Sequence, residues 1–328
     1  MHTNFIIRGF GHYAPERVLT NADLEKFVDT TDEWITSRTG IKQRHIVAEG
    51  EASSDLGLVA ARKALASAGM EASELTHIVF ATFTPDYVIP STACVLQEKL
   101  GIVGQMCIDV QAACSGFLYA VETARGYVAL NPSAKVLVVA AEVVTSRVNW
   151  EDRATCVLFG DAAGAVVLTT GADENPRVVD IMLGADGALG DLLTVRGSGS
   201  AIPYKLGQAV GEEYFVEFQG REVFKHAVRH MASISEALMA RHGLTSADVD
   251  VLIPHQANWR IIDAVGRKLG IPLERVYSNV DRYGNTSAAS VPVALSEALE
   301  LGVIKPGHRV LVPTFGGGFT WGAMLVQF

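Results

Sequence analysis

The stretch ARKALASAGMEASELTHIVFATF (61–83) decides how the fold is interpreted, because SEALMARHGLTSADVDVLIPHQ (235–256) repeats its pattern. Each stretch begins with apolar residues at helical spacing and reaches a glycine typical of a helix end, Gly69 or Gly243. Each then passes through a short acidic turn into an apolar run, and a second helix follows that ends in the same four residues, Lys-Leu-Gly-Ile. The sequence therefore predicts one α/β unit that occurs twice.

The two units keep the same order after this point. A helix of small residues begins at Cys114 in the first unit (CSGFLYAVETARGYV) and at Asn285 in the second (NTSAASVPVALSEAL). In each unit the helix leads to an apolar strand and then to a strand interrupted by glycine. These strands are expected at 135–142 and 160–168 in the first unit, and at 309–315 and 318–326 in the second. The shared order places Cys114 and Asn285 at equivalent points, near helix N-termini beside the central interface.

The alternation of strands and helices predicts the fold class. Such alternation indicates a largely parallel sheet with helices packed on its faces. We therefore expect an α/β fold of two pseudo-symmetric halves, 1–172 and 173–328, and the length of 328 residues agrees with two units of ~150 residues each. Two unrelated stretches that share common words are the alternative, and four landmarks in matching order disfavour it.

The composition excludes several classes of protein. With 49% hydrophobic and 19% charged residues, the chain has the composition of a folded protein. A formal charge of −9 argues against nucleic acid as the main partner, because phosphate binding needs a basic face. No apolar run reaches the ~18–20 residues of a membrane span, and the N-terminal sequence lacks the features of a secretory signal. Four cysteines are too few for a disulfide scaffold. We expect a cytoplasmic protein with no membrane partner.

Cys114, in QAACSGF, is the first candidate for chemistry. A thiol at a helix N-terminus faces free backbone N–H groups and the positive end of the helix dipole, which predicts a lowered pKa and a reactive thiolate. A cysteine among small residues is also a common core packer, and the sequence around Cys114 alone leaves both interpretations open.

His255, Asn285 and the glycines at 316–318 are the other candidates. His255 follows an apolar strand in the motif His-Gln-Ala-Asn, and ligands of such sheets bind at the carboxyl ends of strands. Asn285 has two N–H donors that could polarise a carbonyl, and glycines allow a bare N–H to approach an oxyanion. Each also has a structural interpretation: a buried histidine, a helix N-cap and a tight hairpin.

Four motifs follow one another in a fixed order and spacing: AACSGF, PHQAN, YGNTSAAS and FGGGFTWG. With them the chain resembles the condensing enzymes of the thiolase superfamily, and most closely the β-ketoacyl-acyl carrier protein synthase III family. The resemblance covers essentially the whole chain. It implies a thiolase-like fold with helix-sheet-helix-sheet-helix layers. It also implies a decarboxylative condensation of a short acyl-CoA with malonyl-acyl carrier protein, which initiates type II fatty acid synthesis and needs no metal or other cofactor.

The resemblance assigns roles to individual residues. Cys114 is the acylated nucleophile, and the N–H groups of Cys114 and Gly317 form the oxyanion hole. His255 and Asn285 hold the carbonyl of the malonyl thioester. The resemblance also places Trp34 and Arg153 around the adenine of CoA and Arg38 near its phosphates.

The resemblance further implies a carrier-protein surface and a homodimer. From the residues themselves, a local basic patch on two helices that flank His255 is expected to receive the acidic carrier protein, although each of its members could instead lie on a solvated helix face: Lys225, Arg229, Arg260, Arg267 and Lys268. Ile89 stands where well-known members have an aromatic residue that reaches into the partner's acyl pocket, so a longer or branched primer is expected to fit.

Other functions stay open at this point. A condensing enzyme of secondary metabolism could share every catalytic residue. A papain-like hydrolase has the same Cys-His-Asn order, and the gap of 141 residues between Cys114 and His255 suits it, but the words around Cys114 do not. The incomplete dinucleotide fingerprint excludes a nucleotide-binding oxidoreductase, and His226 and His230 lack a third ligand for a zinc site. The complete Cys-His-Asn set argues against a non-catalytic interaction protein.

Overall fold

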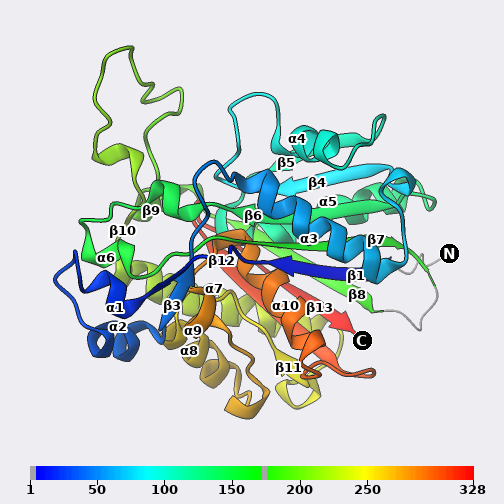
Figure 1. Cartoon of the computed structure of the whole chain (residues 1–328). Coiled ribbons are helices and arrows are strands. Elements are labelled where there is room, and N and C mark those ends of the chain that lie inside the picture. Colours follow the sequence, from blue (N-terminus) through cyan, green and yellow to red (C-terminus); the bar gives the residue numbers. More distant parts are fainter. Residues whose placement is uncertain (1–4, 172–175) are drawn as a thin grey trace.

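A mixed sheet forms the framework of the protein (Figure 1). The computed structural model describes residues 5–171 and 176–328, and within these ranges nine strands join edge to edge. In spatial order they are β11 (Val251–Leu252), β12 (Arg309–Gly316), β13 (Thr320–Gln327), β8 (Arg177–Ala185), β1 (Phe5–Tyr13), β7 (Ala162–Thr170), β6 (Val136–Glu142), β4 (His77–Ala81) and β5 (Met106–Val110).

The prediction of a largely parallel sheet is wrong. Only β4 with β5, β4 with β6, and β11 with β12 pair in parallel among the described strands of this sheet. The strands β7 and β13 run antiparallel to their predecessors β6 and β12. The physical reason is the connection: β12 returns through the glycine turn straight into β13, and no long helix crosses over between β6 and β7, so each strand reverses direction.

The predicted repeat is confirmed by the order of the elements. The first half has the spatial order β5-β4-β6-β7-β1. The second half has the matching order Val276-β11-β12-β13-β8, in which Val276 forms a parallel bridge to Leu252 and takes the place of β5. Three helices of the first half correspond to three of the second: α3 (Ser53–Ala68), α4 (Thr92–Lys99) and α5 (Gly116–Leu130), against α7 (Gly220–Arg241), α8 (Trp259–Leu269) and α10 (Ser290–Glu300). The predicted boundary at 172/173 lies outside the described residues and stays a prediction.

Alternating side chains divide the core into layers. In β6, Val136 and Val138 face a central cluster with α5 and α10, whereas Leu137 and Val139 face an outer cluster with α3 and α4. In β12, Val310 and Val312 face the same central cluster, and Leu311 faces a second outer cluster with α7 and α8. The two middle helices are therefore enclosed between the two halves of the sheet, which gives the expected helix-sheet-helix-sheet-helix order.

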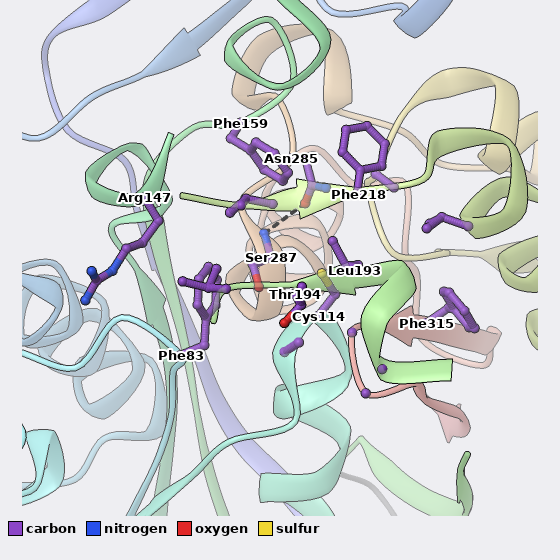
Figure 2. Close-up of a pocket in the computed structure, with 18 of the residues that line it drawn as sticks. Phe83, Cys114, Arg147, Phe159, Leu193, Thr194, Phe218, Asn285, Ser287 and Phe315 are labelled. Atoms are coloured by element: carbon purple, nitrogen blue, oxygen red, sulfur yellow. Dashed lines mark hydrogen bonds between the residues drawn. The ribbon is translucent and has the colours of Figure 1, made fainter. Parts of the chain in front are cut away.

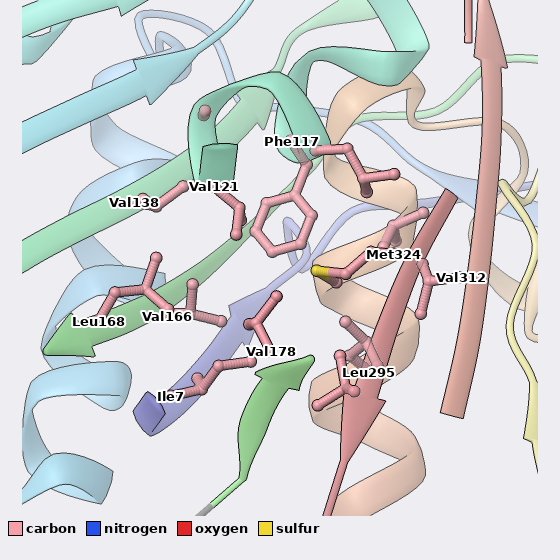
Figure 3. Close-up of a cluster of buried hydrophobic side chains, with 14 of the residues drawn as sticks. Ile7, Phe117, Val121, Val138, Val166, Leu168, Val178, Leu295, Val312 and Met324 are labelled. Atoms are coloured by element: carbon pink, nitrogen blue, oxygen red, sulfur yellow. The ribbon is translucent and has the colours of Figure 1, made fainter. Parts of the chain in front are cut away.

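The central cluster connects the two halves (Figure 3). Phe117 and Val121 of α5 meet Leu295 of α10, Val312 and Met324 in one fully buried group. At ~25 cal/mol per Å² of apolar surface removed from water, such shared burial is the main force that holds the halves together. It also fixes the first turns of α5 and α10 relative to each other.

Shorter elements surround this framework. They are β2 (Val18–Thr20), β3 (Gln43–His45), β9 (Leu193–Thr194), β10 (Glu217–Phe218), α1 (Asn21–Leu24), α2 (Asp32–Thr39), α6 (Arg153–Cys156) and α9 (Val280–Tyr283). Two 3₁₀ turns, Ala113–Ser115 and Ser287–Ala289, lead directly into α5 and α10. Across the described residues, no helix combines the length and the apolar character that crossing a membrane requires.

Candidate active site

Residues from both halves line one cavity of about 630 Å³ (Figure 2). Cys114 comes from the 3₁₀ turn before α5, His255 from the segment after β11, Asn285 from the segment before α10, and Gly317 from the turn between β12 and β13. The structure thus brings together the four residues that the sequence selected. The residue Cys114 is 9% exposed, and it lines this cavity.

A strained turn positions Cys114. The preceding residue, Ala113, has a φ of 45°, a left-handed conformation that a side chain rarely adopts, and the 3₁₀ turn then runs into α5. The glycine turn is tied to this segment, because Ser115 Oγ donates to the Thr320 carbonyl at 3.1 Å and Thr320 Oγ1 donates to the Ala112 carbonyl at 2.8 Å. The thiol is therefore held between two packed elements.

The expected equivalence of Cys114 and Asn285 is wrong by three residues. Ser287 has a φ of 50° at the start of the second 3₁₀ turn, so it corresponds to Ala113. Cys114 therefore corresponds to Ala288, and Asn285 corresponds to Gln111, which also lines the cavity. The sequence repeat located the correct helix starts, but the similar words did not fix their register.

The expected reactive thiolate is also wrong for the resting protein. Burial raises the pKa of the Cys114 thiol to about 12, the nearby Ser287 hydroxyl lowers it, and the Glu142 carboxylate raises it. Cys114 lies in the 3₁₀ turn that precedes α5, inside the protein, where the loss of hydration outweighs the favourable effect of the helix N-terminus. Cys114 is therefore a thiol until a substrate reaches it.

Glu142 is a buried carboxylate beside the site that the sequence analysis missed. Its Oε2 accepts hydrogen bonds from Thr82 Oγ1 at 2.9 Å, Thr84 Oγ1 at 2.8 Å and the Phe83 N–H at 3.1 Å, and its Oε1 accepts from Ser287 Oγ at 3.1 Å. Burial raises the pKa of Glu142 to about 7 although these donors lower it. An acidic residue at the end of the apolar strand KVLVVAAE was the available signal.

His255 is a neutral imidazole with one ring nitrogen occupied. The residue is 2% exposed, and burial lowers its pKa to about 3. Its backbone N–H donates to the Pro313 carbonyl at 2.8 Å, and its Nδ1 lies 2.6 Å from Ser290 Oγ. The ring is therefore anchored on one side, which leaves Nε2 as the nitrogen available to a ligand in the cavity.

Asn285 is oriented by its own turn (Figure 2). The Ser287 N–H donates to Asn285 Oδ1 at 2.9 Å, and the Asn285 backbone N–H donates to the Leu158 carbonyl at 2.8 Å. With Oδ1 engaged as an acceptor, the amide Nδ2 is the group that can donate. His255 and Asn285 can thus supply two neutral donors to one acceptor in the cavity.

Trp34, Arg38 and Arg153 form a separate cluster on α2 and α6. The guanidinium carbons of Arg38 and Arg153 lie 4.5 and 4.8 Å from the centre of the Trp34 ring. Both arginines therefore stack on Trp34, whereas the resemblance placed only Arg153 beside it. The described residues that line the Cys114 cavity do not include these three.

The five basic residues lie on α7 and α8 as expected, and all five are exposed. Two of them have local carboxylate partners, since Lys225 pairs with Glu222 at 2.7 Å and Arg267 pairs with Asp263 at 2.9 Å. The Arg260 side chain donates to the Ser37 carbonyl at 3.3 Å, which links α8 to α2. The same two helices also contribute Ala227 and Ile261 to the cavity wall, so the basic surface adjoins the site.

His226 and His230 do not form an isolated pair. Their rings stack with centroids 5.8 Å apart, and each has a ring nitrogen within hydrogen-bonding distance of Arg229. A cation between two imidazoles disfavours a second cation there, so the zinc interpretation has no support.

Ile89 lies outside the cavity of its own chain. It is 85% exposed and the adjacent Val88 is 97% exposed, at the tip of a loop that precedes α4. The loop is near β5, which is the terminal strand of the sheet among the described strands. The described residues that line the Cys114 cavity do not include Ile89, so its role at an acyl pocket stays a prediction.

Comparison with known proteins identifies the family of the chain. Residues 108–187 match the family described as 3-oxoacyl-[acyl-carrier-protein (ACP)] synthase III, and residues 239–328 match the family described as its C terminal. A beta-ketoacyl-[acyl-carrier-protein] synthase III of Oleidesulfovibrio alaskensis is 61% identical over 100% of both chains.

Two solved structures extend the comparison. A crystal structure of 3-oxoacyl-[acyl-carrier-protein] synthase III from Aquifex aeolicus is 44% identical, with a TM-score of 0.91, over 99% of this chain and 100% of that one. The priming beta-ketosynthase from the R1128 polyketide biosynthetic pathway is 32% identical, with a TM-score of 0.91, over 99% and 96%. The chain therefore belongs to the beta-ketoacyl-[acyl-carrier-protein] synthase III family.

Proposed function

We propose that the protein condenses a short acyl-CoA with malonyl-acyl carrier protein and that Cys114, His255 and Asn285 carry the reaction. The observation that supports this most is the meeting of a thiol and two neutral donors, from opposite halves of the fold, in one cavity. An acid–base hydrolase would need a base near the thiol, and a histidine whose pKa is lowered to about 3 is a poor base.

The first half-reaction transfers the acyl group to Cys114. The sulfur attacks the thioester carbon of the acyl-CoA, and the backbone N–H groups of Cys114 and Gly317 hold the oxyanion. The sulfur–carbon bond to CoA then breaks, and the proton of the Cys114 thiol ends on the CoA sulfur. Because burial disfavours a free thiolate here, the thiol gives up its proton only as the new sulfur–carbon bond forms, so that the negative charge develops on the held oxygen and not on the sulfur.

The second half-reaction uses His255 and Asn285. Their N–H groups donate to the thioester carbonyl of malonyl-acyl carrier protein, so that loss of CO₂ leaves an enolate on that oxygen. The enolate carbon attacks the acyl group on Cys114, the acyl–sulfur bond breaks, and 3-oxoacyl-acyl carrier protein leaves. A proton from solvent restores the thiol. No step requires a metal or a redox cofactor.

The substrate-binding surfaces are proposed from their position. The cluster of Trp34, Arg38 and Arg153 offers a flat aromatic ring and two cations to the nucleotide of CoA. Three members of the basic surface have no local carboxylate partner among the described residues: Arg229, Arg260 and Lys268. These three would receive the acidic carrier protein.

A homodimer would explain the exposed apolar edge. Tyr87, Val88 and Ile89 are exposed together near the terminal strand β5, and Val103 beside that strand is 90% exposed. A second copy seated along β5 would cover this surface and receive Ile89. The aliphatic side chain supports a pocket that accepts longer or branched primers.

The alternative is a condensing enzyme of secondary metabolism. The polyketide priming synthase supports it, but its 32% identity is far below the 61% of the fatty-acid-type relative, so we favour type II fatty acid synthesis. The cytoplasmic location expected from the sequence stays a prediction.

The test is release of CO₂ from carboxyl-labelled malonyl-acyl carrier protein, measured with acetyl-CoA, butyryl-CoA and isobutyryl-CoA as primers. We expect CO₂ and 3-oxoacyl product with each primer, no product from the Cys114→Ala variant, and normal product from Cys94→Ala, which removes an exposed cysteine instead. Product formation by Cys114→Ala, or turnover with no CO₂, would overturn the proposal.

A further inference from the structure

Ser290 stands behind the imidazole of His255. It is the first residue of α10, it is 2% exposed, and its Oγ lies 2.6 Å from His255 Nδ1, the nitrogen that faces away from the cavity. The contact has the short length of a well-formed hydrogen bond inside a dry core.

The surroundings of Ser290 decide which partner donates. The Gln256 backbone N–H approaches the same Oγ at 3.4 Å and occupies an acceptor position of the hydroxyl. Among the contacts of the described residues, His255 Nδ1 is the acceptor that the Ser290 O–H meets. A hydroxyl that already receives a donor is best satisfied when its own hydrogen points to the imidazole.

We propose that Ser290 is a positioning residue that donates to His255 Nδ1 and so fixes the ring hydrogen on Nε2. This inference rests on the proposed function, because only an Nε2–H can donate to the malonyl thioester carbonyl. In the opposite tautomer, a lone pair on Nε2 would face the enolate oxygen and repel it. The neutral state of His255, which its buried position enforces, makes the choice of tautomer decisive.

The same assignment separates the two half-reactions. With hydrogen on Nε2, His255 is a donor and not the base that takes the Cys114 proton. Loss of the Ser290 hydroxyl should therefore slow decarboxylation and condensation while it spares acylation of Cys114. A residue that only supported the fold would slow both.

The first measurement is made on the unmodified protein. In ¹⁵N-histidine-labelled enzyme, the protonated and unprotonated nitrogens of a neutral imidazole have well-separated shifts, and comparison with a His255→Gln variant assigns the His255 signals. We expect Nε2 protonated and Nδ1 unprotonated. The reverse tautomer would overturn the role of Ser290, and with it the role of His255 as a donor, without any variant. Acylation of Cys114 and release of CO₂, measured on the same protein, test the proposed condensation separately.

The second measurement compares variants. For Ser290→Ala we expect decarboxylation and condensation about 10- to 100-fold slower, with Cys114 acylation changed less than about threefold and a mixture of His255 tautomers. Ser290→Thr, which keeps a hydroxyl, should restore the Nε2–H tautomer and most of the rate. The matched control is Ser296→Ala, which removes a serine of the same helix whose Oγ lies 2.9 Å from His12 Nδ1, away from the site.

The outcomes separate the claims. Equal losses in both half-reactions, or a Ser290→Ala enzyme with unchanged condensation and tautomer, would overturn the role of Ser290. Failure of the unmodified enzyme to acylate Cys114 or to release CO₂ would instead refute the proposed function, whichever nitrogen of His255 carries the hydrogen.

Discussion

Replacing Gly316 with alanine tests how tightly the site is built. Gly316 ends β12, and a Cβ atom added there would lie 2.6 Å from the Cys114 backbone nitrogen and 3.1 Å from both Cα and Cβ of Cys114. Neither side can retreat easily, because Gly316 is paired with Thr320 in the hairpin and Thr320 is hydrogen-bonded to the residues around Cys114.

The size of the effect follows from these distances. Ordinary carbon–nitrogen contacts need about 3.4 Å or more, so the backbone at Cys114 must move by most of an ångström. Overpacking of this kind costs about 1–3 kcal/mol of stability. Displacing a catalytic group by ~1 Å costs about 100-fold in rate, and here the displaced group is an N–H of the proposed oxyanion hole.

The assay is the rate of Cys114 acylation by acyl-CoA, followed by intact-protein mass, together with the melting temperature. The control is Gly126→Ala on α5, the helix that follows Cys114, where nothing lies within 4 Å of the added Cβ. That variant should gain about 0.5–1 kcal/mol and keep its acylation rate. A Gly316→Ala enzyme that acylates and melts like the unmodified protein would refute the packing described here.

Three further predictions concern charge, the carrier surface and the primer. Glu142 has a pKa raised to about 7 from 4.5, so its contribution to stability is present below pH ~4.5 and is lost as the pH rises through ~7, by about 3 kcal/mol. Burial also raises the pKa of Asp161, to about 6, so urea unfolding from pH 4.5 to 8 should show a loss in both proteins that is about 3 kcal/mol smaller in Glu142→Gln than in the unmodified protein. Arg260→Ala should raise the KM for malonyl-acyl carrier protein roughly 3- to 30-fold, while the KM for acyl-CoA stays constant. The control Arg275→Ala, outside the proposed basic surface, should change neither KM. Equal effects of Arg260→Ala on both KM values would refute the carrier site. Ile89→Phe should lower activity with isobutyryl-CoA relative to acetyl-CoA, measured as a ratio of kcat/KM, and an unchanged ratio would show that Ile89 does not face the acyl pocket.

The fold could be predicted where local patterns are strong. The expected glycines, Gly69 and Gly243, follow helix ends in the left-handed conformation, and the repeated order of elements is present. The direction of the strands could not be predicted from the same patterns. An apolar strand has the same sequence pattern in a parallel and in an antiparallel sheet. Only the short hairpin at 317–319 shows that β13 runs antiparallel to β12.

The site could be predicted as a set of residues but not as an electrostatic environment. Cys114, His255, Asn285 and Gly317 meet because their segments end at one cavity. The raised pKa of Cys114 arises from burial beneath elements distant in the sequence, and no local motif encodes that. Ser290 was missed for the same reason, since a serine in a helix start resembles an ordinary cap until the imidazole is placed against it.

The most direct test of the central claim is the mass of the intact protein after incubation with acyl-CoA. The account predicts one acyl group, mapped by peptide digestion to Cys114, in the unmodified protein and also in His255→Ala and Asn285→Ala, which would hold the acyl group but release no CO₂ from malonyl-acyl carrier protein. Cys114→Ala should gain no mass. Acylation at another cysteine, or a protein that condenses without ever carrying an acyl group, would contradict it.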